Sequence, residues 1–325
     1  MKQPVVSDHL FCVADFVVRI TFAPSQVNGM SLIPSFEPFR TSVGSVRVTG
    51  DEGRSGQYEA GPGAAGIGPY SVPLLFHLTV DDSLPPIRAH GRERIGCFDT
   101  GNGETAVDRL PDGGYQYIIR DIDHGDCCLL QADKSFANCR CALHGDYTMR
   151  SFGLMNALML IFAFAAGSHS TLMVHASALR YGGRGYAFIA RSGTGKSTHV
   201  NQWMRAVAGT EILNDDTPIV RIIGDDVFIY GSPWSGKTTC YRQVKAPLGA
   251  ITRIERAQAN SIERLRPIQA FACLFPSCST MKWDKDIFDA LCRNITAIVE
   301  RIPIYTLYCL PDEAAAELCH ATVSM

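Results

Sequence analysis

The stretch GYAFIARSGTGKST, Gly185 to Thr198, decides the fold of this 325-residue chain. It begins with a short apolar run that predicts a strand, turns through a glycine-rich segment, and continues into a segment whose Val200, Trp203 and Val207 share one helical face. A strand, a glycine-rich turn and a helix in this order suit a phosphate-binding loop, because the N–H groups of the turn and the positive end of the helix together attract an anion. The order predicts an α/β core around residues 190–197.

A second stretch matches the phosphate-loop pattern at every position, but the residues within and after it suit a phosphate site less well. GSPWSGKT, Gly231 to Thr238, satisfies G-x-x-x-x-G-K-[ST] in full, whereas the first loop has Ala190 where the first glycine belongs. However, Pro233 removes a backbone donor, and the TCYRQVKAP that follows is a short polar stretch stopped by a proline. The sequence therefore favours the imperfect loop as the nucleotide site, with Lys237 of the second stretch lining the same pocket.

Acidic residues follow the first loop at the place where such a loop needs them. Asn214, Asp215 and Asp216 close the strand-like EIL, whereas nothing comparable follows Thr238. Carboxylates at the end of a neighbouring strand hold magnesium or accept the proton of an attacking hydroxyl. The two aspartates therefore complete a candidate phosphoryl-transfer site with the first loop.

The pattern of predicted secondary structure changes near residue 149. Residues 1–148 are β-rich and irregular and form one expected domain, and residues 149–325 alternate helix with strand and form an expected α/β domain. The expected strands of the first domain are 11–22, 45–49, 71–80, 94–99, 104–110 and 115–122, with a hairpin at PDGG and another over CCLLQADKSFANCRCAL, 127–143. The second domain is expected to contain helices at 151–167, 197–208, 260–274, 284–300 and 312–319, and strands at 170–181, 185–190, 211–223, 225–232 and 302–310.

Composition and charge exclude several classes of function. The formal net charge is -2, so the chain lacks the basic balance of a protein that binds nucleic acid or an anionic membrane. Asp8 and Asp15 interrupt the apolar N-terminal run, which lacks a signal-peptide pattern, and the most apolar segment, Leu154 to Gly167, is shorter than a bilayer span. The chain has 12 cysteines and no export signal, which indicates reduced thiols and a cytoplasmic protein.

Together with His175, these motifs carry a resemblance to a known family. Their order is VHASAL (174–179), GYAFIARSGTGKST, ILNDD (212–216), YGSPWSGK (230–237), APLGAI (246–251) and IPIYTLYCLPDEA (302–314). This order resembles the HPr kinase/phosphorylase family, and more closely the HPr-kinase-related proteins that accompany peptide-modifying gene sets, including kinases of lasso peptides. The resemblance covers roughly residues 151–322. It implies a P-loop kinase domain with a fold related to that of phosphoenolpyruvate carboxykinase.

Carried over residue by residue, the resemblance implies an ATP- and Mg2+-dependent kinase. Lys196 would contact the β- and γ-phosphates, and Ser197 would hold magnesium together with Asp216. Asp215 is favoured as the general base, with the reverse assignment of the two aspartates left open, and His175 would lie near the γ-phosphate. The residues implied to bind the nucleotide are Ser192, Gly193, Thr194, Gly195, Lys196, Ser197 and Thr198.

The expected acceptor is a serine or threonine hydroxyl of a peptide or small protein, and the resemblance also allows a homo-oligomer. Two alternatives stay open. One is a nucleotide-binding regulatory protein without turnover, since Phe228 stands where the family carries a metal-binding glutamate, and the other is a small-molecule kinase on the same fold. Arg242 and Lys245 either reach the phosphates or are solvated, and Trp234 either packs on adenine or a peptide or contacts no ligand.

Overall fold

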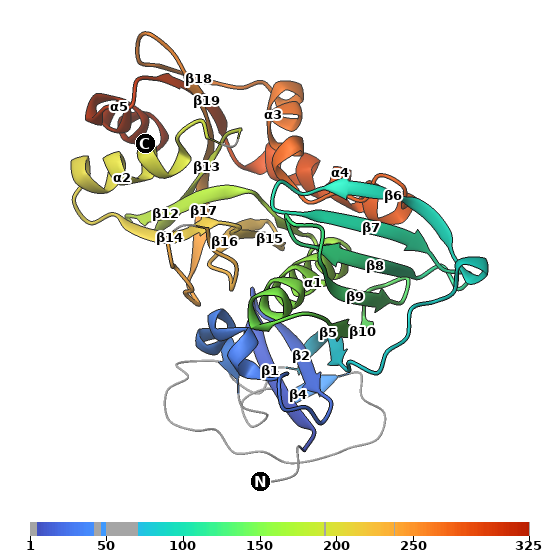
Figure 1. Ribbon diagram of the computed structural model, residues 1–325. Helices are drawn as coiled ribbons and strands as arrows, with labels where there is room; N and C mark the ends of the chain where they lie inside the picture. Colours follow the sequence, from blue (N-terminus) through green and yellow to red (C-terminus); the bar gives the residue numbers. More distant parts are fainter. Residues whose placement is uncertain (1–4, 42–46, 50–70, 192, 237, 325) are drawn as a thin grey trace. The chain divides into compact units, whose positions relative to one another are not determined.

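The computed structural model describes residues 5–41, 47–49, 71–191, 193–236 and 238–324. The chain is a mixed α/β protein, rich in β-sheet and with few helices (Figure 1). It divides into two compact units, Met1–Ala165 and Ala166–Met325, and each has its own sheet. The sequence placed the boundary between residues 148 and 149, before the long apolar helix. In the structure most of this helix belongs to the first unit, and the division falls in its last turn.

The first unit is built on one sheet. Its strands are β1 (Ser7–Val13), β2 (Phe16–Phe22), β3 (Arg40–Thr41), β4 (Arg47–Thr49), β5 (Ser71–Val80), β6 (Glu93–Asp99), β7 (Glu104–Arg109), β8 (Tyr115–Arg120), β9 (Asp126–Ala132) and β10 (Asn138–Leu143). They follow the order β3-β1-β2-β5-β10-β9-β8-β7-β6, with β4 beside β5. Strand β5 runs parallel to β2, β4 and β10, and the other neighbours are antiparallel. The short 3-10 helices η1 (Met30–Leu32), η2 (Pro34–Phe39) and η3 (Ala89–Gly91) lie in the connections.

Both predicted hairpins of this unit form. PDGG joins β7 to β8, where Arg109 pairs with Tyr115, and the cysteine-rich stretch forms the antiparallel pair β9 and β10. The single strand predicted over 11–22 is wrong, because the chain turns back between β1 and β2. Ala14 and Asp15 form this turn with φ angles of 49° and 61°. Two successive positive φ angles match the right-handed twist of a hairpin, but neither residue is the glycine or asparagine that usually signals such a turn.

Helix α1 (Tyr147–Gly167) packs within the first unit. Gly153 lets the helix approach β9 closely, since a Cβ atom there would lie 2.8 Å from the Cβ of Cys128. Near the other end, the ring of Phe162 contacts Phe16 edge to face, with 6.3 Å between the centroids. The sequence predicted a buried helix shorter than a bilayer span. The predicted length is wrong, because the helix has 21 residues and is long and apolar enough to cross a membrane, and half of its apolar window is buried inside the protein.

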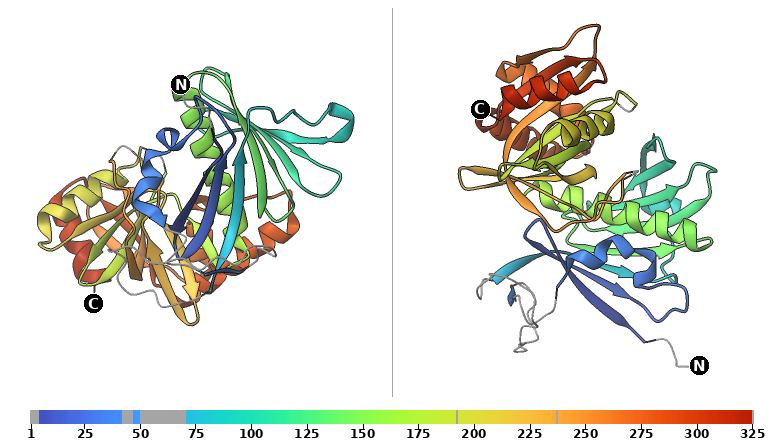
Figure 2. Two further views of the ribbon diagram at one scale, coloured as in Figure 1. Left: turned by 90° about the horizontal axis from the view of Figure 1, so that it is seen from below. Right: turned by 90° about the vertical axis from the view of Figure 1, so that its left-hand side faces the viewer.

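The second unit is a sheet covered by helices on both faces. Its strands are β11 (Thr171–Met173), β12 (Ala176–Tyr181), β13 (Arg184–Ile189), β14 (Glu211–Asp216), β15 (Ile219–Ile223), β16 (Asp226–Tyr230), β17 (Lys245–Arg256), β18 (Ser261–Arg264) and β19 (Ile304–Cys309). Its helices are α2 (Lys196–Ala206), α3 (Pro267–Leu274), α4 (Lys285–Arg301) and α5 (Glu313–Val323), with a 3-10 turn η4 (Phe275–Ser277). The strand order is β11-β15-β16-β17-β13-β12-β14, and β19 pairs with both β17 and β18. Helices α2 and α5 contact each other over one buried cluster, and α3 and α4 pack on the other (Figure 2).

Strand β17 is the centre of this sheet, and the sequence did not predict it. Its first residues pair antiparallel with β16, and its later residues lie between the parallel strands β13 and β19. Pro247 and Gly249 both look like strand breakers. In the structure, however, Pro247 pairs with Phe228, and the register between β13 and β17 skips Gly249. A Cβ atom on Gly249 would lie 2.8 Å from the ring of Tyr186, so this glycine allows a close approach of two strands.

Three further predictions for this unit need correction. The strand predicted over 211–223 is broken between β14 and β15 at Thr217 and Pro218. The helix predicted over 260–274 is wrong in its first half, because β18 occupies that half and pairs antiparallel with β19. The strand predicted over 170–181 is broken between β11 and β12 at Val174 and His175. His175 therefore lies just before the amino end of β12 rather than inside a strand.

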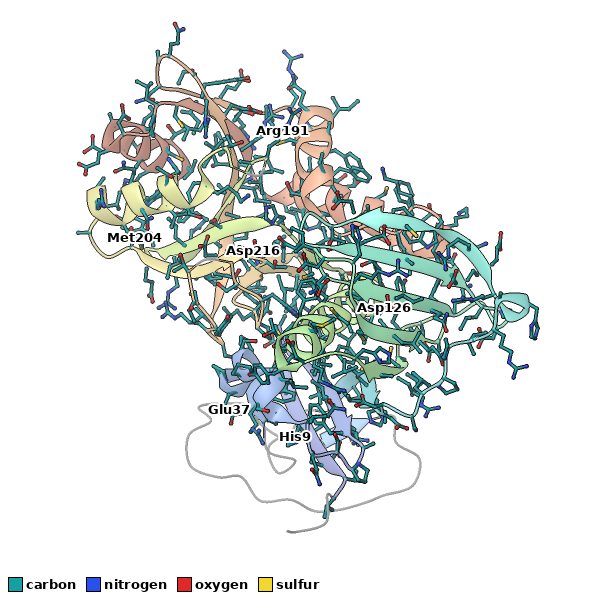
Figure 3. The ribbon with its side chains drawn as sticks, viewed as in Figure 1. His9, Glu37, Asp126, Arg191, Met204 and Asp216 are labelled. Atoms are coloured by element: carbon teal, nitrogen blue, oxygen red, sulfur yellow. The ribbon has the colours of Figure 1, made fainter. Side chains whose placement is uncertain are left out.

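The sheet topology brings three strand ends together. Strand β12 is antiparallel to both β13 and β14, so β13 and β14 run in the same direction, one on each side of it. The carboxyl ends of β13 and β14 and the amino end of β12 consequently lie at one edge of the sheet. Figure 3 labels two residues of this edge, Asp216 at the end of β14 and Arg191 in the turn after β13.

Candidate functional site

The first glycine loop connects β13 to α2 with the backbone geometry that glycines permit. Gly193 and Gly195 have φ angles of 75° and 122°, and α2 begins directly after Gly195. Ala190 is not among the described residues with positive φ, so the alanine that replaces the first glycine of the pattern fits its backbone without strain. Ser192, which the sequence assigned to the nucleotide, lies outside the described residues.

Arg256 at the end of β17 fixes this loop from the neighbouring strand. Its Nη2 donates to the carbonyl of Gly193 at 2.6 Å, and its Nε donates to the carbonyl of Thr194 at 3.1 Å. Because the guanidinium binds these carbonyl oxygens, it holds the turn that precedes α2 in one conformation. No sequence pattern indicated this contact, since more than 60 residues separate the partners and β17 was not predicted.

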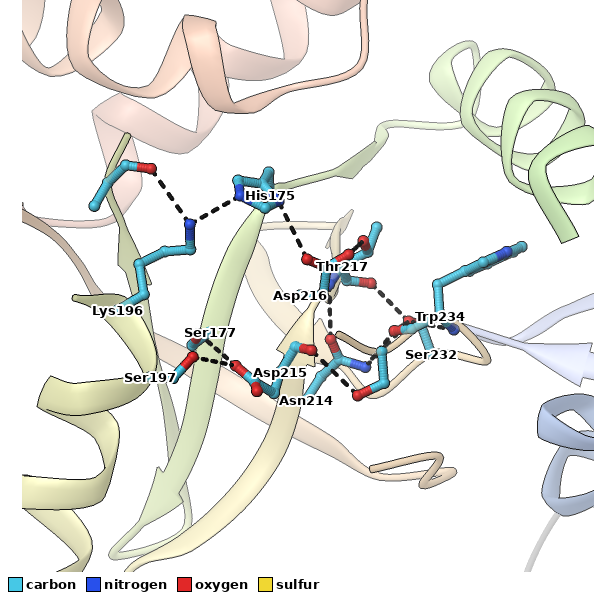
Figure 4. A network of polar contacts seen from close by, with 12 residues as sticks. His175, Ser177, Lys196, Ser197, Asn214, Asp215, Asp216, Thr217, Ser232 and Trp234 are labelled. Atoms are coloured by element: carbon cyan, nitrogen blue, oxygen red, sulfur yellow. Dashed lines mark hydrogen bonds and ion pairs between the residues drawn. The ribbon is translucent and has the colours of Figure 1, made fainter. Parts of the chain in front are cut away.

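Lys196, the first residue of α2, points toward the acidic edge. Its Nζ lies 2.8 Å from Nε2 of His175, and Nδ1 of the same ring lies 3.5 Å from Oδ1 of Asp216 (Figure 4). Since an ammonium can only donate, Nε2 of His175 is the acceptor and the ring is neutral. Burial and the Lys196 charge lower the pKa of His175 against the opposing effect of the aspartates, and burial also lowers the pKa of Lys196.

Asp215 is the buried member of the acidic pair and accepts two hydroxyl hydrogen bonds. Its Oδ1 accepts from Ser177 at 2.7 Å and from Ser197 at 3.3 Å, and the residue is only 4% exposed. The contact with Ser197 links the first turn of α2 directly to the end of β14. Ser177 was missed by the sequence analysis. It lies two residues after His175, and alternation along a strand would have placed both side chains on the same face.

Asp216 has a strained backbone, and a buried polar network supports the turn that contains it. Its φ angle is 145°, a region that residues other than glycine rarely adopt. Asn214, which is fully buried, donates from Nδ2 to Ser232 Oγ at 3.2 Å and to the carbonyl of Trp234 at 3.0 Å, and its Oδ1 accepts from the N–H of Thr217 at 2.9 Å. The amide therefore fixes the chain on both sides of the aspartates.

The letter-perfect motif belongs to a segment that runs along the edge strand β14. We call residues 231–244 the edge segment, and residues 238–244, all of them described, form no helix. Ser235 forms a bridge with Asp216, and the N–H of Gly236 donates to the carbonyl of Asp215. A Cβ atom on Gly231 would lie 2.0 Å from the carbonyl oxygen of Arg242, so this glycine serves a close backbone contact. Gly236 thus packs against the acidic pair, Gly231 packs against the backbone of Arg242 away from it, and Lys237 lies outside the described residues.

Three other residues singled out from the sequence lie away from the loop. Arg242 donates to Glu211 and to the carbonyl of Ile212, near the beginning of β14 and therefore far from its acidic end. The Lys245 ammonium lies 4.3 Å from the ring centroid of Phe228. Trp234 is 5% exposed and takes part in the site through its backbone carbonyl. Of the two readings left open for these cations, the solvated one suits Lys245, which is exposed, whereas Arg242 is paired with Glu211.

The structure brings together five of the residues predicted from the sequence. They are His175 just before β12, Lys196 and Ser197 of α2, and Asp215 and Asp216 of β14, and all five belong to the network of polar contacts in Figure 4. Gly193, Thr194 and Gly195 form the turn before α2, and Thr198 lies in its first turn. The arrangement combines an ammonium, a helix N-terminus, a hydroxyl and two carboxylates around one edge of the sheet.

Comparison with known proteins identifies no family. No protein-family model matches the chain, and no curated protein matches it in sequence. Among solved structures, the Hpr(Ser) kinase/phosphatase from Coxiella burnetii matches with a TM-score of 0.28 and 8% sequence identity, and the match covers 46% of this chain and 94% of that chain. A TM-score of this size carries no weight for the fold or the function, so the following proposal rests on the residues of the site.

Proposed function

We propose that the protein is an ATP-dependent kinase that transfers the γ-phosphate to a serine or threonine hydroxyl of a peptide or small protein. The observation that carries this proposal is the contact between Ser197 and Asp215. It joins the first turn of the helix after a glycine loop to a carboxylate at the end of β14, which runs in the same direction as β13. P-loop enzymes use such a hydroxyl and carboxylate to hold Mg2+ between phosphates and protein. The order of motifs resembling HPr-kinase-related proteins supports the choice of a hydroxyl on a peptide or small protein.

The residues at this edge fit a magnesium nucleotide. Mg2+ prefers oxygen ligands and is usually held by one or two carboxylates together with substrate phosphates, so a dedicated cage is not needed. The described residues contain no group of three or more histidine, cysteine, aspartate or glutamate side chains that could hold a metal. Ser197 and Asp215 supply a hydroxyl and a carboxylate next to each other. A bound Mg2+ would neutralise charge that develops on the transferred phosphoryl group.

The roles of the two aspartates follow from their surroundings. The sequence favoured Asp215 as the base and Asp216 as the metal ligand, but the contacts support the opposite division. Asp215 is buried and faces Ser197, whereas the Asp216 side chain is 39% exposed and faces His175. In the proposed reaction the acceptor oxygen attacks the γ-phosphorus, the bond to the β–γ bridging oxygen breaks, Asp216 takes the hydroxyl proton, and ADP leaves. Lys196 and the N–H groups of the loop bind the phosphate oxygens.

The experiment measures binding and transfer separately. Purified protein with Mg2+ and γ-labelled ATP is incubated with a library of serine- and threonine-containing peptides, and ATP binding is measured by calorimetry. Lys196→Ala is expected to weaken ATP binding, and Asp216→Asn to retain binding and lose transfer. Asp225→Asn, the same change in the exposed turn between β15 and β16, is the matched control.

The outcomes distinguish the alternatives. ATP binding without hydrolysis or transfer would indicate a nucleotide-dependent regulatory protein, and label that moves only to a metabolite would indicate a small-molecule kinase. Absence of ATP binding in the unmodified protein would refute the proposal altogether. For the two carboxylates, a raised Mg2+ requirement in Asp215→Asn but not in Asp216→Asn would support the division given above, and the reverse result would restore the assignment made from the sequence.

A further inference from the structure

A cleft of about 350 Å3 opens beside the first turns of α2. Its walls include Thr198 and Gln202 from α2, Ile254 and Arg256 from β17, and Cys309 and Asp312 from the end of β19 and the residues after it. In the sheet, β17 and β19 lie on one side of β13, whereas β12 and β14 with the acidic pair lie on the other. The glycine loop therefore stands between the cleft and the aspartates. The volume lies in the range of small-molecule sites.

Two buried polar atoms at this cleft have no partner among the described residues. His199 is 4% exposed, and its Nε2 makes no hydrogen bond there. Gln202 donates from Nε2 to the carbonyl of Pro311 at 3.2 Å, which orients the amide and leaves Oε1 as a buried acceptor without a donor. Native structures rarely leave such atoms unsatisfied, because a buried polar group without a partner costs about 1–3 kcal/mol. Both residues line the cleft, so a ligand bound there would lie beside polar groups that no described residue satisfies.

Asp312 adds a carboxylate to the same cleft. It is the N-cap of α5, and its Oδ1 accepts from the N–H of Ala315 and from Nδ2 of Asn260, both at 2.9 Å. Both donors reach the same oxygen, so the second oxygen is available to a ligand hydroxyl. Carboxylates at the end of a strand bind ribose hydroxyls in this way in dinucleotide-binding proteins. Ile254 and Cys309 give the cleft an apolar wall against which a flat ring can pack.

We propose that this cleft binds the nucleoside of the triphosphate, with the ribose hydroxyls donating to Asp312 and an edge of the base facing Gln202 and His199. The inference rests on the proposed function, since the phosphates would lie in the glycine loop. The nucleotide would then extend from the cleft across the loop, and its γ-phosphate would reach the acidic pair on the far side.

The first test separates nucleoside binding from phosphate binding. Ala257 lines the cleft directly after β17, and Ala257→Phe fills it. We expect this variant to bind MgATP about tenfold more weakly or worse, while its dissociation constant for magnesium tripolyphosphate stays within about twofold. Ala259→Phe, the same change at an exposed position two residues further on, is the matched control. Lys196→Ala is expected to weaken the binding of both ligands.

The second test addresses Asp312 through the ribose. Asp312→Asn keeps an N-cap oxygen, so α5 is retained. The unmodified protein is expected to bind ATP about tenfold more tightly than 2′,3′-dideoxy-ATP, because hydrogen bonds to a charged acceptor are lost in the analogue. Asp312→Asn should reduce this ratio to about two or less.

The results of the two tests have distinct meanings. If Ala257→Phe binds ATP normally, or if the unmodified protein does not distinguish ATP from tripolyphosphate, the nucleoside lies elsewhere and only this inference fails. An equal preference for ATP over the dideoxy analogue in Asp312→Asn and the unmodified protein removes the role of Asp312. If the unmodified protein binds neither ATP nor tripolyphosphate, the proposed function fails and this inference fails with it.

Discussion

Acidification should destabilise the second unit through His199, a buried histidine in α2. Burial lowers the pKa of His199 from 6.5 to about 4. Its ring packs against Phe188 at 4.8 Å and Trp203 at 6.1 Å between centroids. As the pH falls below 6.5, the unfolded chain binds a proton at this residue while the folded chain does not. Folding stability therefore falls with pH between 6.5 and 4 and is fully present above 6.5.

The size of the effect follows from the difference between the two pKa values. Each unit is worth about 1.4 kcal/mol, so His199 removes roughly 3 kcal/mol of stability by about pH 4 and somewhat over 2 kcal/mol by about pH 4.5. His199→Phe replaces the ring with one that cannot bind a proton. We expect the variant to be as stable as the unmodified protein at neutral pH, or slightly more stable, because Nε2 has no partner among the described residues.

Tryptophan fluorescence makes this measurement specific to one unit. Trp203, Trp234 and Trp283, the only tryptophans of the chain, all lie in the second unit. Urea unfolding at about pH 7 and about pH 4.5 should show a loss of stability that is roughly 2–3 kcal/mol smaller in His199→Phe than in the unmodified protein. His320→Phe, which replaces the other histidine ring against Trp203, controls for the altered surroundings of the fluorophore. Equal losses in His199→Phe and the unmodified protein would refute the reasoning.

Three further outcomes are expected from single substitutions. Ser177→Ala removes the shorter hydrogen bond to Asp215 and, under the proposed function, should lower kcat about tenfold with little change in the KM for ATP; an unchanged kcat would make Ser177 a structural residue. Ala190→Gly restores the motif letter and should leave ATP affinity within about twofold while lowering stability by about 0.5–1 kcal/mol, as calorimetry and urea unfolding can check. Gly231→Ala places a Cβ atom against the carbonyl of Arg242 and should destabilise the second unit by about 2 kcal/mol or more in the same fluorescence assay, whereas a stable variant would show that the edge segment can shift.

The parts of the site that are local in sequence were predictable. A strand, a glycine turn and a helix follow one another without interruption at residues 185–206, and β14 carries its acids at its own end, so the sequence alone indicated Lys196, Ser197 and the aspartate pair. The local structure also agrees with the preference for the imperfect motif, Ala190 to Ser197, over the complete motif, Gly231 to Thr238. A helix follows the first glycine loop, and none follows the second within the described residues.

The parts that depend on pairing between distant segments were not predictable. Arg256 reaches the glycine loop only because β17 lies beside β13. Strand β17 was not predicted because it contains Pro247 and Gly249. The sheet accommodates Pro247 where β17 pairs with β16, and Gly249 at a register shift against β13. Asn214 looks like an ordinary polar residue before two acids, and its supporting role appears only when the edge segment folds back along β14. Strand β18 was mistaken for helix because its pairing with β19 overrides the local pattern.

The backbone of Asp216 has a consequence for how this chain can diverge. Glycine adopts a φ angle of 145° without strain, whereas the same angle costs other residues about 1–3 kcal/mol. Drift that conserved only the fold would thus favour glycine at this position, and under the proposed function selection for a proton acceptor would retain the carboxylate. Among sequences descended from this one, aspartate at position 216 would mark those that keep the chemistry of the site, and glycine would mark those that have lost it.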